Sequence, residues 1–476
     1  MRRLPFVVAA LLLGAVSALL VFGSVRGQAT TPVALLITGG TVVTMDGARQ
    51  VIPFGAVAID AGKIVAVGPA DDISQKYSGG QRIDAAGQVI LPGLINAHTH
   101  APMVLFRGLA DDLALMDWLN NYIFPAESKT VSPEFVQIGT RLAALEMIES
   151  GTTTFADMYY FEDDIANATR EAGLRAVLGQ SVIKFPVADA KTPEDALVRA
   201  EAFIQKWQGN PLITPAVAPH APYTLDAAPL KGARALANKY GVPMLIHLAE
   251  TKQEVQIIQD AHHQSPTQYL ESLGLWQGRS LAAHAVYLDD KDIDTLAARK
   301  VGLSHNPGSN MKLASGIASV PKWIAKGTLA GLGTDGAASS NDLDMFSAMR
   351  FAAFLGKVGT GDPRVTSAAQ VLEMATRGGA AALGLSDRIG SLEPGKEADV
   401  ILVAMDGARQ TPMFDPISHL VYVSHGDDVR TVIVGGRVLM RDRQVLSLNA
   451  GTVLRDARAM AERVKRAVTP APKETK

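Results

Sequence analysis

The chain has 476 residues, of which 47% are hydrophobic and 19% charged, and its formal net charge is −2 at pH 7. This length and composition predict a folded protein with one large and one smaller domain, and the near-neutral charge excludes the basic signature of nucleic-acid binders. The absence of cysteine excludes disulfides, cysteine nucleophiles and cysteine-ligated metals, so a metal would need His, Asp or Glu ligands.

The first predicted element is a targeting segment. Arg2 and Arg3 precede an apolar run from Leu4 to Phe22, and small residues follow as far as Ala29. A charged start, an apolar middle and small residues before the mature chain are typical of a signal peptide, although the run is nearly long enough to span a bilayer. We therefore expect residues 1–29 to direct export to the periplasm or the medium. They would be either cleaved off or retained as a membrane anchor, and we expect no other membrane contact.

Short β-like runs broken by glycine follow this segment and return near the end of the chain. They include ALLITGGTVVTM and GAVAIDAGKIVAVG early, and DRIGSLEPGKEADVILVAM and VRTVIVGGRVLMRDRQVL late. Alternating apolar positions with glycine punctuation indicate antiparallel strands. We expect residues 30–91 and 389–449 to pair into one small flanking β-sandwich. Residues 450–476 would then form a C-terminal helix and tail.

The middle of the chain, residues 92–388, alternates strand-like and helix-like segments. Its strand ends read GLINAHTH, TTTFADM, AVLGQSV, ITPAVAPH, PMLIHLAE, LAAHAV, VGLSHNPGSN and LAGLGTD. Eight βα units in about 300 residues predict an α/β fold of the (β/α)₈ barrel type, and an open doubly wound sheet is the alternative.

Residues with metal-binding chemistry fall at the carboxyl ends of these predicted strands. His98 and His100 end the first strand, His247 the fifth and Asp335 the eighth. In a β-strand the side chains of His98 and His100 point to the same face, and strand ends of a barrel converge on one side, where active sites form. Three imidazoles and one carboxylate suit one divalent metal ion, Zn²⁺ first and Fe²⁺ or Mn²⁺ as alternatives.

Three further residues at these strand ends carry candidate catalytic or binding groups. Glu250 follows His247 by three residues, close enough to move a proton between water and substrate. His284 ends the sixth strand and could bind the attacking water or a developing oxyanion. His220 ends the fourth strand and could contact a polar group of the substrate. Each of them, taken alone, could instead be a structural polar residue.

Together, these motifs resemble the amidohydrolase superfamily, and within it the branch of 5′-methylthioadenosine/S-adenosylhomocysteine deaminases and triazine hydrolases. The resemblance runs from about Val33 to Val445. It is carried by LPGLINAHTHAPMVLFRGLADDLALMDWLNNYIFPAE, HLAE, LAAHAV, SHNPGSNMKLASG and LGTDGAASSNDLDMF. It implies a barrel with a flanking sandwich and one metal, held by His98, His100, His247 and Asp335.

The resemblance also implies roles for individual residues. It implies that Glu250 protonates a ring nitrogen and that Asp335 takes the proton of the water. It places His284 beside that water, and Glu127 and His220 at the sugar. Members that use S-adenosylhomocysteine carry an arginine near the third strand end. The stretch LGQSVIKFPVADAKTPED offers only two lysines as cations.

We therefore expect a metal-dependent hydrolase of carbon–nitrogen bonds that deaminates an aminated purine nucleoside, of adenosine, 5′-methylthioadenosine or S-adenosylhomocysteine type, and releases ammonia. The alternative is a hydrolase of the same fold that acts on another C–N or C–Cl bond, as in a triazine, guanine, cytosine or a cyclic amide. A third hypothesis is an exported metal- or solute-binding protein without catalysis, against which Glu250 argues. The expected partner is a small molecule, and the sequence leaves open whether the chain forms a homo-oligomer.

Overall fold

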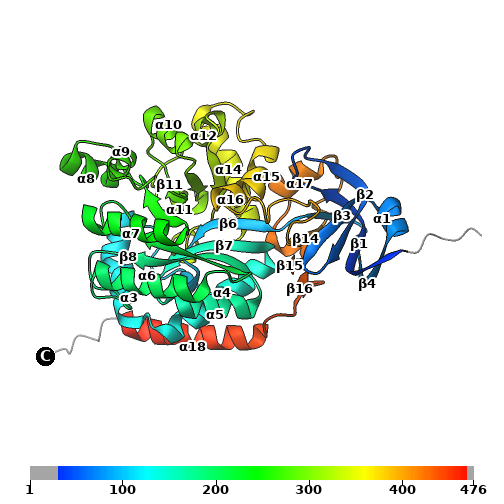
Figure 1. Cartoon of the computed structure of the whole chain (residues 1–476), viewed down its shortest axis with the longest axis horizontal. Coiled ribbons are helices and arrows are strands. Elements are labelled where there is room, and N and C mark those ends of the chain that lie inside the picture. The colour runs from blue at the N-terminus through cyan, green and yellow to red at the C-terminus, as the bar shows by residue number, and fades with distance from the viewer. Residues whose placement is uncertain (1–29, 469–476) are drawn as a thin grey trace, which may run out of the picture.

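The computed structural model describes residues 30–468. Figure 1 shows a helix-covered barrel with a smaller β-rich part at one end. The predicted export segment lies in residues 1–29, outside the described residues. Within the described range, none of the helices is both long and apolar enough to span a bilayer.

The barrel is one parallel sheet of eight strands in which each strand pairs with the next along the chain. The strands are β6 (Leu94–Thr99), β7 (Thr152–Tyr159), β8 (Arg175–Val182), β9 (Ile213–Pro219), β10 (Met244–Leu248), β11 (Ser280–His284), β12 (Gly302–His305) and β13 (Leu329–Leu332). Nearly all of their residues are buried, because both faces of such a sheet are covered. The first and last strands meet where Asp335 N donates to His98 O at 2.9 Å. The predicted (β/α)₈ barrel is confirmed.

Helices between the strands and after the last one surround the barrel. Polar side chains cap several of them: Ser132 Oγ accepts from Phe135 N at the start of α4, and Thr251 Oγ1 accepts from Glu254 N at the start of α8. Gly173, with a φ of 85°, ends α5. The helices are α4 (Pro133–Glu149), α5 (Glu162–Ala172), α6 (Pro193–Trp207), α7 (Ala227–Tyr240), α8 (Lys252–His262), α9 (Pro266–Ser272), α10 (Asp290–Ala298), α11 (Pro307–Lys312), α12 (Val320–Ala325), α13 (Ala337–Ser340), α14 (Met345–Thr360), α15 (Ala368–Met374) and α16 (Arg377–Ala382).

The connection between β6 and α4 is a series of short helical turns beside the carboxyl ends of the strands. It contains η1 (Ala101–Phe106), α2 (Leu115–Trp118), the π-helical turn η2 (Leu119–Ile123) and α3 (Phe124–Thr130). Apolar side chains of this connection are buried, among them Trp118 and Ile123. We call residues 107–130 the covering segment, because several of its side chains line the pocket described below.

The smaller part is a nine-stranded sheet that both halves of the chain build. Its strands are β1 (Thr31–Val43), β2 (Val51–Asp60), β3 (Lys63–Pro69), β4 (Tyr77–Asp84), β5 (Gln88–Pro92), β14 (Val400–Ala404), β15 (Val429–Val434), β16 (Arg437–Arg441) and β17 (Gln444–Val445). β5 and β14 pair antiparallel and join the two halves. Leu35, Val57 and Val400 share one apolar core, so the sheet folds over on itself.

The strand pairing in this sheet differs in part from the antiparallel arrangement that the glycine-punctuated pattern predicts. β1 pairs antiparallel with β2 but parallel with β4 and β5. The physical reason is the crossover helix α1 (Ala70–Lys76), which returns the chain to the other edge of β1 in the same direction as β1.

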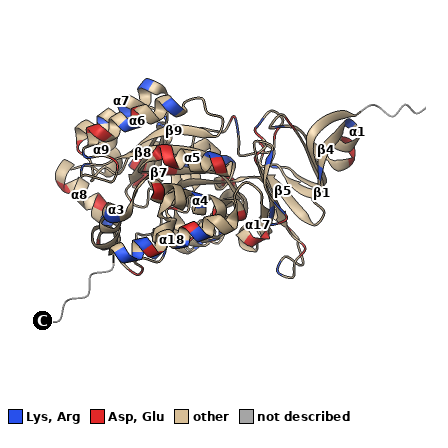
Figure 2. Cartoon of the chain, turned by 90° about the horizontal axis from the view of Figure 1, so that it is seen from below, with Lys and Arg blue, Asp and Glu red and all other residues tan. Residues whose placement is uncertain are grey.

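The last helix and one buried ion pair connect the outer elements to the barrel. α18 (Ala450–Val468) follows α17 (Pro416–Tyr422) and η3 (Gly426–Asp428), and it buries Val453 and Met460 against the barrel helices. Most of its charged residues are exposed, and Figure 2 marks their positions along the helix. Arg175 of β8 donates from Nε to Asp399, just before β14, at 2.9 Å, and both side chains are almost fully buried. Two buried hydrogen bonds from the Arg175 guanidinium group to the Asp399 carboxylate thus join the barrel to the sheet.

Candidate active site

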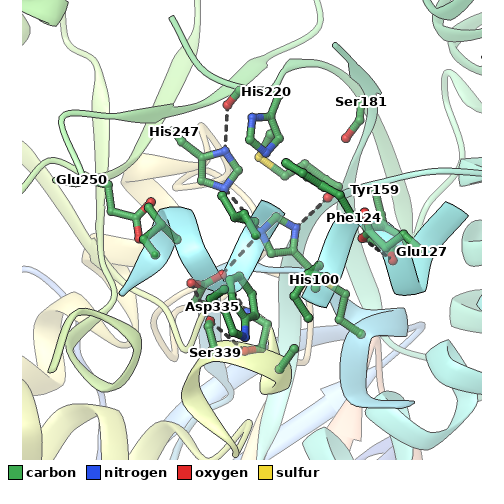
Figure 3. A pocket seen from close by; sticks show the side chains of 18 of the residues that line it. His100, Phe124, Glu127, Tyr159, Ser181, His220, His247, Glu250, Asp335 and Ser339 are labelled. Carbon is green, nitrogen blue, oxygen red and sulfur yellow. Dashed lines mark hydrogen bonds and ion pairs between the residues drawn. The ribbon is translucent and has the colours of Figure 1, made fainter. Parts of the chain in front are cut away.

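A pocket opens at the carboxyl ends of the barrel strands (Figure 3). It holds about 660 Å³ of space, part of it open to solvent. Polar side chains from the strand ends line one side, and apolar side chains of the covering segment line the other. Those of the covering segment are Leu115, Trp118, Leu119, Ile123 and Phe124. The pocket therefore combines a chemically active wall with an apolar cover, as expected of a small-molecule site.

Two histidines in this pocket point their Nε2 atoms at one place. His100 Nδ1 bonds to Met158 O at 2.7 Å, and His247 Nδ1 bonds to His220 O at 2.7 Å. Because a carbonyl oxygen can only accept, both Nδ1 atoms carry the proton and both Nε2 atoms present a lone pair. These two Nε2 atoms lie 3.3 Å apart, an arrangement that repels unless something positive lies between them.

His98, on β6, and Asp335, just after β13, lie beside the place to which the Nε2 atoms of His100 and His247 point. His98 Nε2 is buried and makes no hydrogen bond, while Asp335 Oδ1 lies 3.4 Å from the Nε2 atoms of both His98 and His100. Burial lowers the pKa of His98 to about 4, so its imidazole is neutral at pH 7. Burial raises the pKa of Asp335, but the neighbouring histidines outweigh it and hold the pKa well below its usual range.

Asp335 is itself held by its neighbours. Gly336 N donates to Oδ1 at 2.7 Å, and Ser339 Oγ donates to Oδ2 at 2.9 Å. The backbone of Asp335 has a φ of 63°, a left-handed conformation that turns the chain sharply after β13. This turn brings the carboxylate back over the strand ends. It therefore explains why Asp335, three residues beyond β13, faces His98 and His100.

Glu250 and His284 form the neighbouring edge of the site. His284 Nδ1 lies 3.8 Å from Glu250 Oε1 and bonds to Asn310 Oδ1 at 2.9 Å, while its Nε2 lies 3.9 Å from Asp335 Oδ2. Glu250 is buried, and burial raises its pKa, partly offset by His284. The two carboxyl groups are thus perturbed in opposite directions, which favours a proton on Glu250 and a negative charge on Asp335.

The backbone that carries Glu250 is fixed by Glu254 of α8. Glu254 Oε1 accepts from Ala249 N at 2.7 Å, and Oε2 accepts from Glu250 N at 2.9 Å. Burial raises the pKa of Glu254 to about 7, while the two backbone N–H groups oppose that rise. Both oxygens of a buried carboxyl group therefore hold the loop between β10 and α8 in place.

Glu127 and His220 lie on other walls of the pocket. Glu127 belongs to the covering segment, and Tyr159 Oη donates to its Oε1 at 2.7 Å. Burial raises the pKa of Glu127 to about 7, partly offset by that hydrogen bond. His220 bonds through Nδ1 to Thr224 Oγ1 at 3.2 Å, so its ring is held where it lines the pocket. Both residues can therefore offer hydrogen bonds to a polar part of a ligand.

The structure brings all eight residues that the sequence singled out to this one place. Seven of them line the pocket and His98 lies buried beneath it. Sequence reasoning missed Tyr159, Ser339 and Glu254, which position three of the others. Only Glu254 had a local signal, because a threonine followed three residues later by a glutamate, as in Thr251 to Glu254, is typical of a helix start.

These observations fit a divalent metal ion. Two triplets place their ligand atoms within 4.8 Å of one another: His98, His247 and His284, and His98, His100 and Asp335. The unsatisfied Nε2 of His98 and the facing Nε2 lone pairs of His100 and His247 lack a partner that a cation would supply. Neutral imidazoles and one ionised carboxylate form a donor set that first-row divalent metals prefer.

Comparison with known proteins agrees with this geometry. The model of the Amidohydrolase family matches residues 89–439. A 5-methylthioadenosine/S-adenosylhomocysteine deaminase from Syntrophus aciditrophicus is 46% identical over 430 residues, which cover 90% of this chain and 97% of that protein. One from Syntrophobacter fumaroxidans is also 46% identical, over 90% of this chain and 98% of its own length.

Solved structures of similar proteins cover nearly the whole described range. The zinc-bound crystal structure of an adenosine deaminase from Xanthomonas campestris has a TM-score of 0.91 and 38% identity, covering 92% of this chain and 100% of that one. Atrazine chlorohydrolase from Arthrobacter aurescens, complexed with zinc, has a TM-score of 0.84 at 24% identity, over 90% of this chain and 100% of its own. That second likeness establishes the shared fold.

Proposed function

The chain belongs to the amidohydrolase family, and from that premise we propose that it hydrolytically deaminates an aminated purine nucleoside and releases ammonia. Relatives at 46% identity named as deaminases of 5-methylthioadenosine and S-adenosylhomocysteine support this class of substrate. The observation that carries the proposal is the convergence of His98, His100 and His247 on one point. Asp335 and Glu250 lie beside that point and line the same pocket.

We propose that one Zn²⁺ ion is held by His98, His100, His247 and Asp335, with Fe²⁺ and Mn²⁺ as alternatives. Zinc in the Xanthomonas campestris structure supports this choice. When bound, such an ion supplies Lewis-acid activation of water at neutral pH.

The protein residues supply the proton transfers. Water adds to the amino-bearing ring carbon, and Asp335, ionised in the free site, accepts a proton from that water. Glu250, whose pKa is raised, donates a proton to the adjacent ring nitrogen, so the carbon becomes tetrahedral without a charged ring. Asp335 then gives its proton to the amino group, which leaves as ammonia, and the hydroxyl group passes its proton to Glu250 as the ring carbonyl forms. Burial lowers the pKa of His284, but Glu250 and Asp335 outweigh it and raise that pKa, so the charged ring can donate from Nε2 to the developing oxygen.

The sugar of the nucleoside would lie toward the covering segment. Glu127 Oε1 accepts from Tyr159, which leaves Oε2 to accept from ribose hydroxyl groups. His220 can bind the sugar through the ring nitrogen that Thr224 does not occupy. The covering segment would exclude water from the reacting atoms with apolar side chains such as Trp118 and Leu119.

A substrate panel tests the proposal. Ammonia release would be measured with adenosine, 5′-methylthioadenosine, S-adenosylhomocysteine, guanine and cytosine, and chloride release with a chlorinated triazine, each with the zinc-loaded enzyme. Release from a nucleoside, with chromatographic detection of the hydroxylated purine, is the expected result. Activity restricted to the triazine or to a free base would refute the nucleoside assignment. Binding without any turnover would leave the non-catalytic hypothesis in its place.

We also propose that the protein acts outside the cytoplasm, delivered by the apolar segment from Leu4 to Phe22. The support is the charged start and the small residues near Ala29. The membrane is then a partner only if this segment stays attached to the mature chain.

A further inference from the structure

His284, to which we assign the developing oxygen, lies on a strained stretch of backbone. It ends β11, and both His284 and the following Ala285 have left-handed φ values, of 70° and 49°. Residues that carry a Cβ rarely adopt this conformation, and it persists only where surrounding contacts hold it. Ala285 N donates to Leu248 O at 2.9 Å, which fixes the main chain. The direction of the imidazole ring must be fixed by contacts of its own.

The Nδ1 edge of this ring faces two acceptors. Asn310 Oδ1 lies 2.9 Å from Nδ1, and Glu250 Oε1 lies 3.8 Å from the same atom. Because an amide oxygen can only accept, Nδ1 carries a proton and donates it to Asn310. The distance to Glu250 is too long for a hydrogen bond. The bond to Asn310 thus keeps this proton away from Glu250 and leaves Nε2 for the reacting oxygen.

Asn310 is part of a buried turn behind His284. It belongs to α11, which begins two residues after β12 ends. Asn310 N donates to Asn306 O at 3.0 Å, and Ser315 N donates to Asn310 O at 2.9 Å, so its main chain is held on both sides. Its side chain is 1% exposed, and it does not line the active-site pocket, whereas His284 does. Asn310 can therefore influence the reaction only through other residues.

The amide nitrogen of Asn310 does not explain why an asparagine stands at this position. Nδ2 is buried and has no hydrogen-bond partner among the described residues. A buried N–H group without a partner lowers stability, and a leucine of nearly the same shape would avoid that loss. The oxygen explains the asparagine better, because it accepts from His284.

We propose that Asn310 is a positioning residue for the deamination. By accepting the Nδ1 proton of His284, it directs Nε2 toward the developing oxygen and prevents a bond between His284 and the Glu250 carboxyl group. The inference rests on the proposed function and adds to it a residue that touches neither substrate nor metal. Without the Asn310 oxygen, rotation of the ring would let Nδ1 donate to Glu250 Oε1, now 3.8 Å away. Glu250 would then be drawn away from the ring nitrogen that it protonates.

Replacing Asn310 by leucine tests the proposal in the zinc-loaded enzyme. We expect kcat for the best nucleoside of the panel to fall by about 10- to 100-fold, with KM and metal content close to those of the wild type. Equal falls in kcat and kcat/KM are expected of a contact that acts in the transition state. The urea midpoint should stay close to the wild-type value, because Asn310→Leu also removes the unpaired Nδ2. Asn310→Ala takes its place if leucine prevents folding.

Two matched variants separate the accepting oxygen from the rest of the helix. Asn310→Asp keeps an oxygen at the Oδ1 position, so it should recover most of the kcat that Asn310→Leu loses. Ser309→Ala is the control, because Ser309 precedes Asn310 on α11 and its buried Oγ has no hydrogen-bond partner among the described residues. It should keep the wild-type kcat. An aspartate variant as slow as the leucine variant, or an equal loss in Ser309→Ala, would overturn the proposal.

NMR of isotope-labelled histidines detects the hydrogen bond independently of turnover. The Nδ1 proton of His284 should give a resonance protected from exchange in the wild type and in Asn310→Asp, assigned by its loss in His284→Gln. In Asn310→Leu we expect this resonance to shift or to disappear. An unchanged resonance, or wild-type kcat, in that variant would overturn the proposal. Absence of ammonia from every nucleoside with the wild-type enzyme would instead refute the proposed function, and NMR would still decide whether Asn310 holds His284.

Discussion

Removing the carboxyl group of Glu254 should lower both stability and turnover, although we assign Glu254 no contact with the substrate or the metal. In Glu254→Ala, the N–H groups of Ala249 and Glu250 lose the acceptors that lie at 2.7 and 2.9 Å. Each buried N–H group left without a partner costs about 1–3 kcal/mol, so the free energy of unfolding should fall by roughly 2–6 kcal/mol. In Glu254→Gln, one acceptor oxygen remains and the loss should be about half as large.

The same change should lower turnover, because the loop that it releases carries the proposed proton donor. A displacement of about 1 Å at Glu250 costs on the order of 10²-fold in kcat. Urea unfolding, ammonia release from adenosine and metal content by elemental analysis measure the three effects separately. We expect lower stability and lower kcat with metal retained, because Glu254 lies outside the ligand triplets.

A surface variant of the same helix supplies the control. Asp260→Ala removes an exposed carboxylate of α8 that accepts from Gln256 Nε2, and it should change stability by no more than about 0.5 kcal/mol. Wild-type stability and kcat in Glu254→Ala would refute the reasoning. They would mean that the loop between β10 and α8 keeps its conformation without the two backbone hydrogen bonds.

The remaining predictions concern the metal, the proton donor, the pH dependence of stability and export. His247→Ala should lose most bound metal and all measurable activity, and full metal content in the purified variant would contradict the ligand assignment. Glu250→Gln should keep its metal but lose about 10²-fold or more in kcat. Near-normal turnover in this variant would show that Glu250 is structural and not the proton donor. The pKa of Glu127 is raised to about 7 from 4.5, so its contribution to stability is complete below pH 4.5 and is lost as the pH rises to about 7. Urea unfolding of Glu127→Gln should therefore show a smaller loss of stability over this range, by about 3 kcal/mol, and parallel pH profiles of the two proteins would contradict the burial argument. N-terminal sequencing should find a mature protein that starts near Thr30, or fractionation should find the chain attached to membranes, whereas full-length soluble chain in the cytoplasm would contradict export.

The strand order and the main site residues were predictable from the sequence because both follow local rules. Short runs such as Leu94 to Thr99 and Met244 to Leu248 begin with consecutive apolar residues, which predicts that these strands are buried. Once eight such runs alternate with helices, the barrel topology brings their carboxyl ends together. His98, His247 and Asp335 could therefore be grouped although they lie up to 237 positions apart, counted from 98 to 335.

Packing between distant segments decided the rest. The parallel pairing of β4 and β5 with β1 depends on where α1 crosses the sheet. The bond from Tyr159 to Glu127 and the pairing of Phe124 with Phe185 join the covering segment to the loops after other strands. Such contacts depend on how two separate segments pack against each other, and local sequence patterns do not predict that packing. The class of reaction could thus be inferred from the residues at the strand ends, whereas the shape of the pocket could be known only from the tertiary structure.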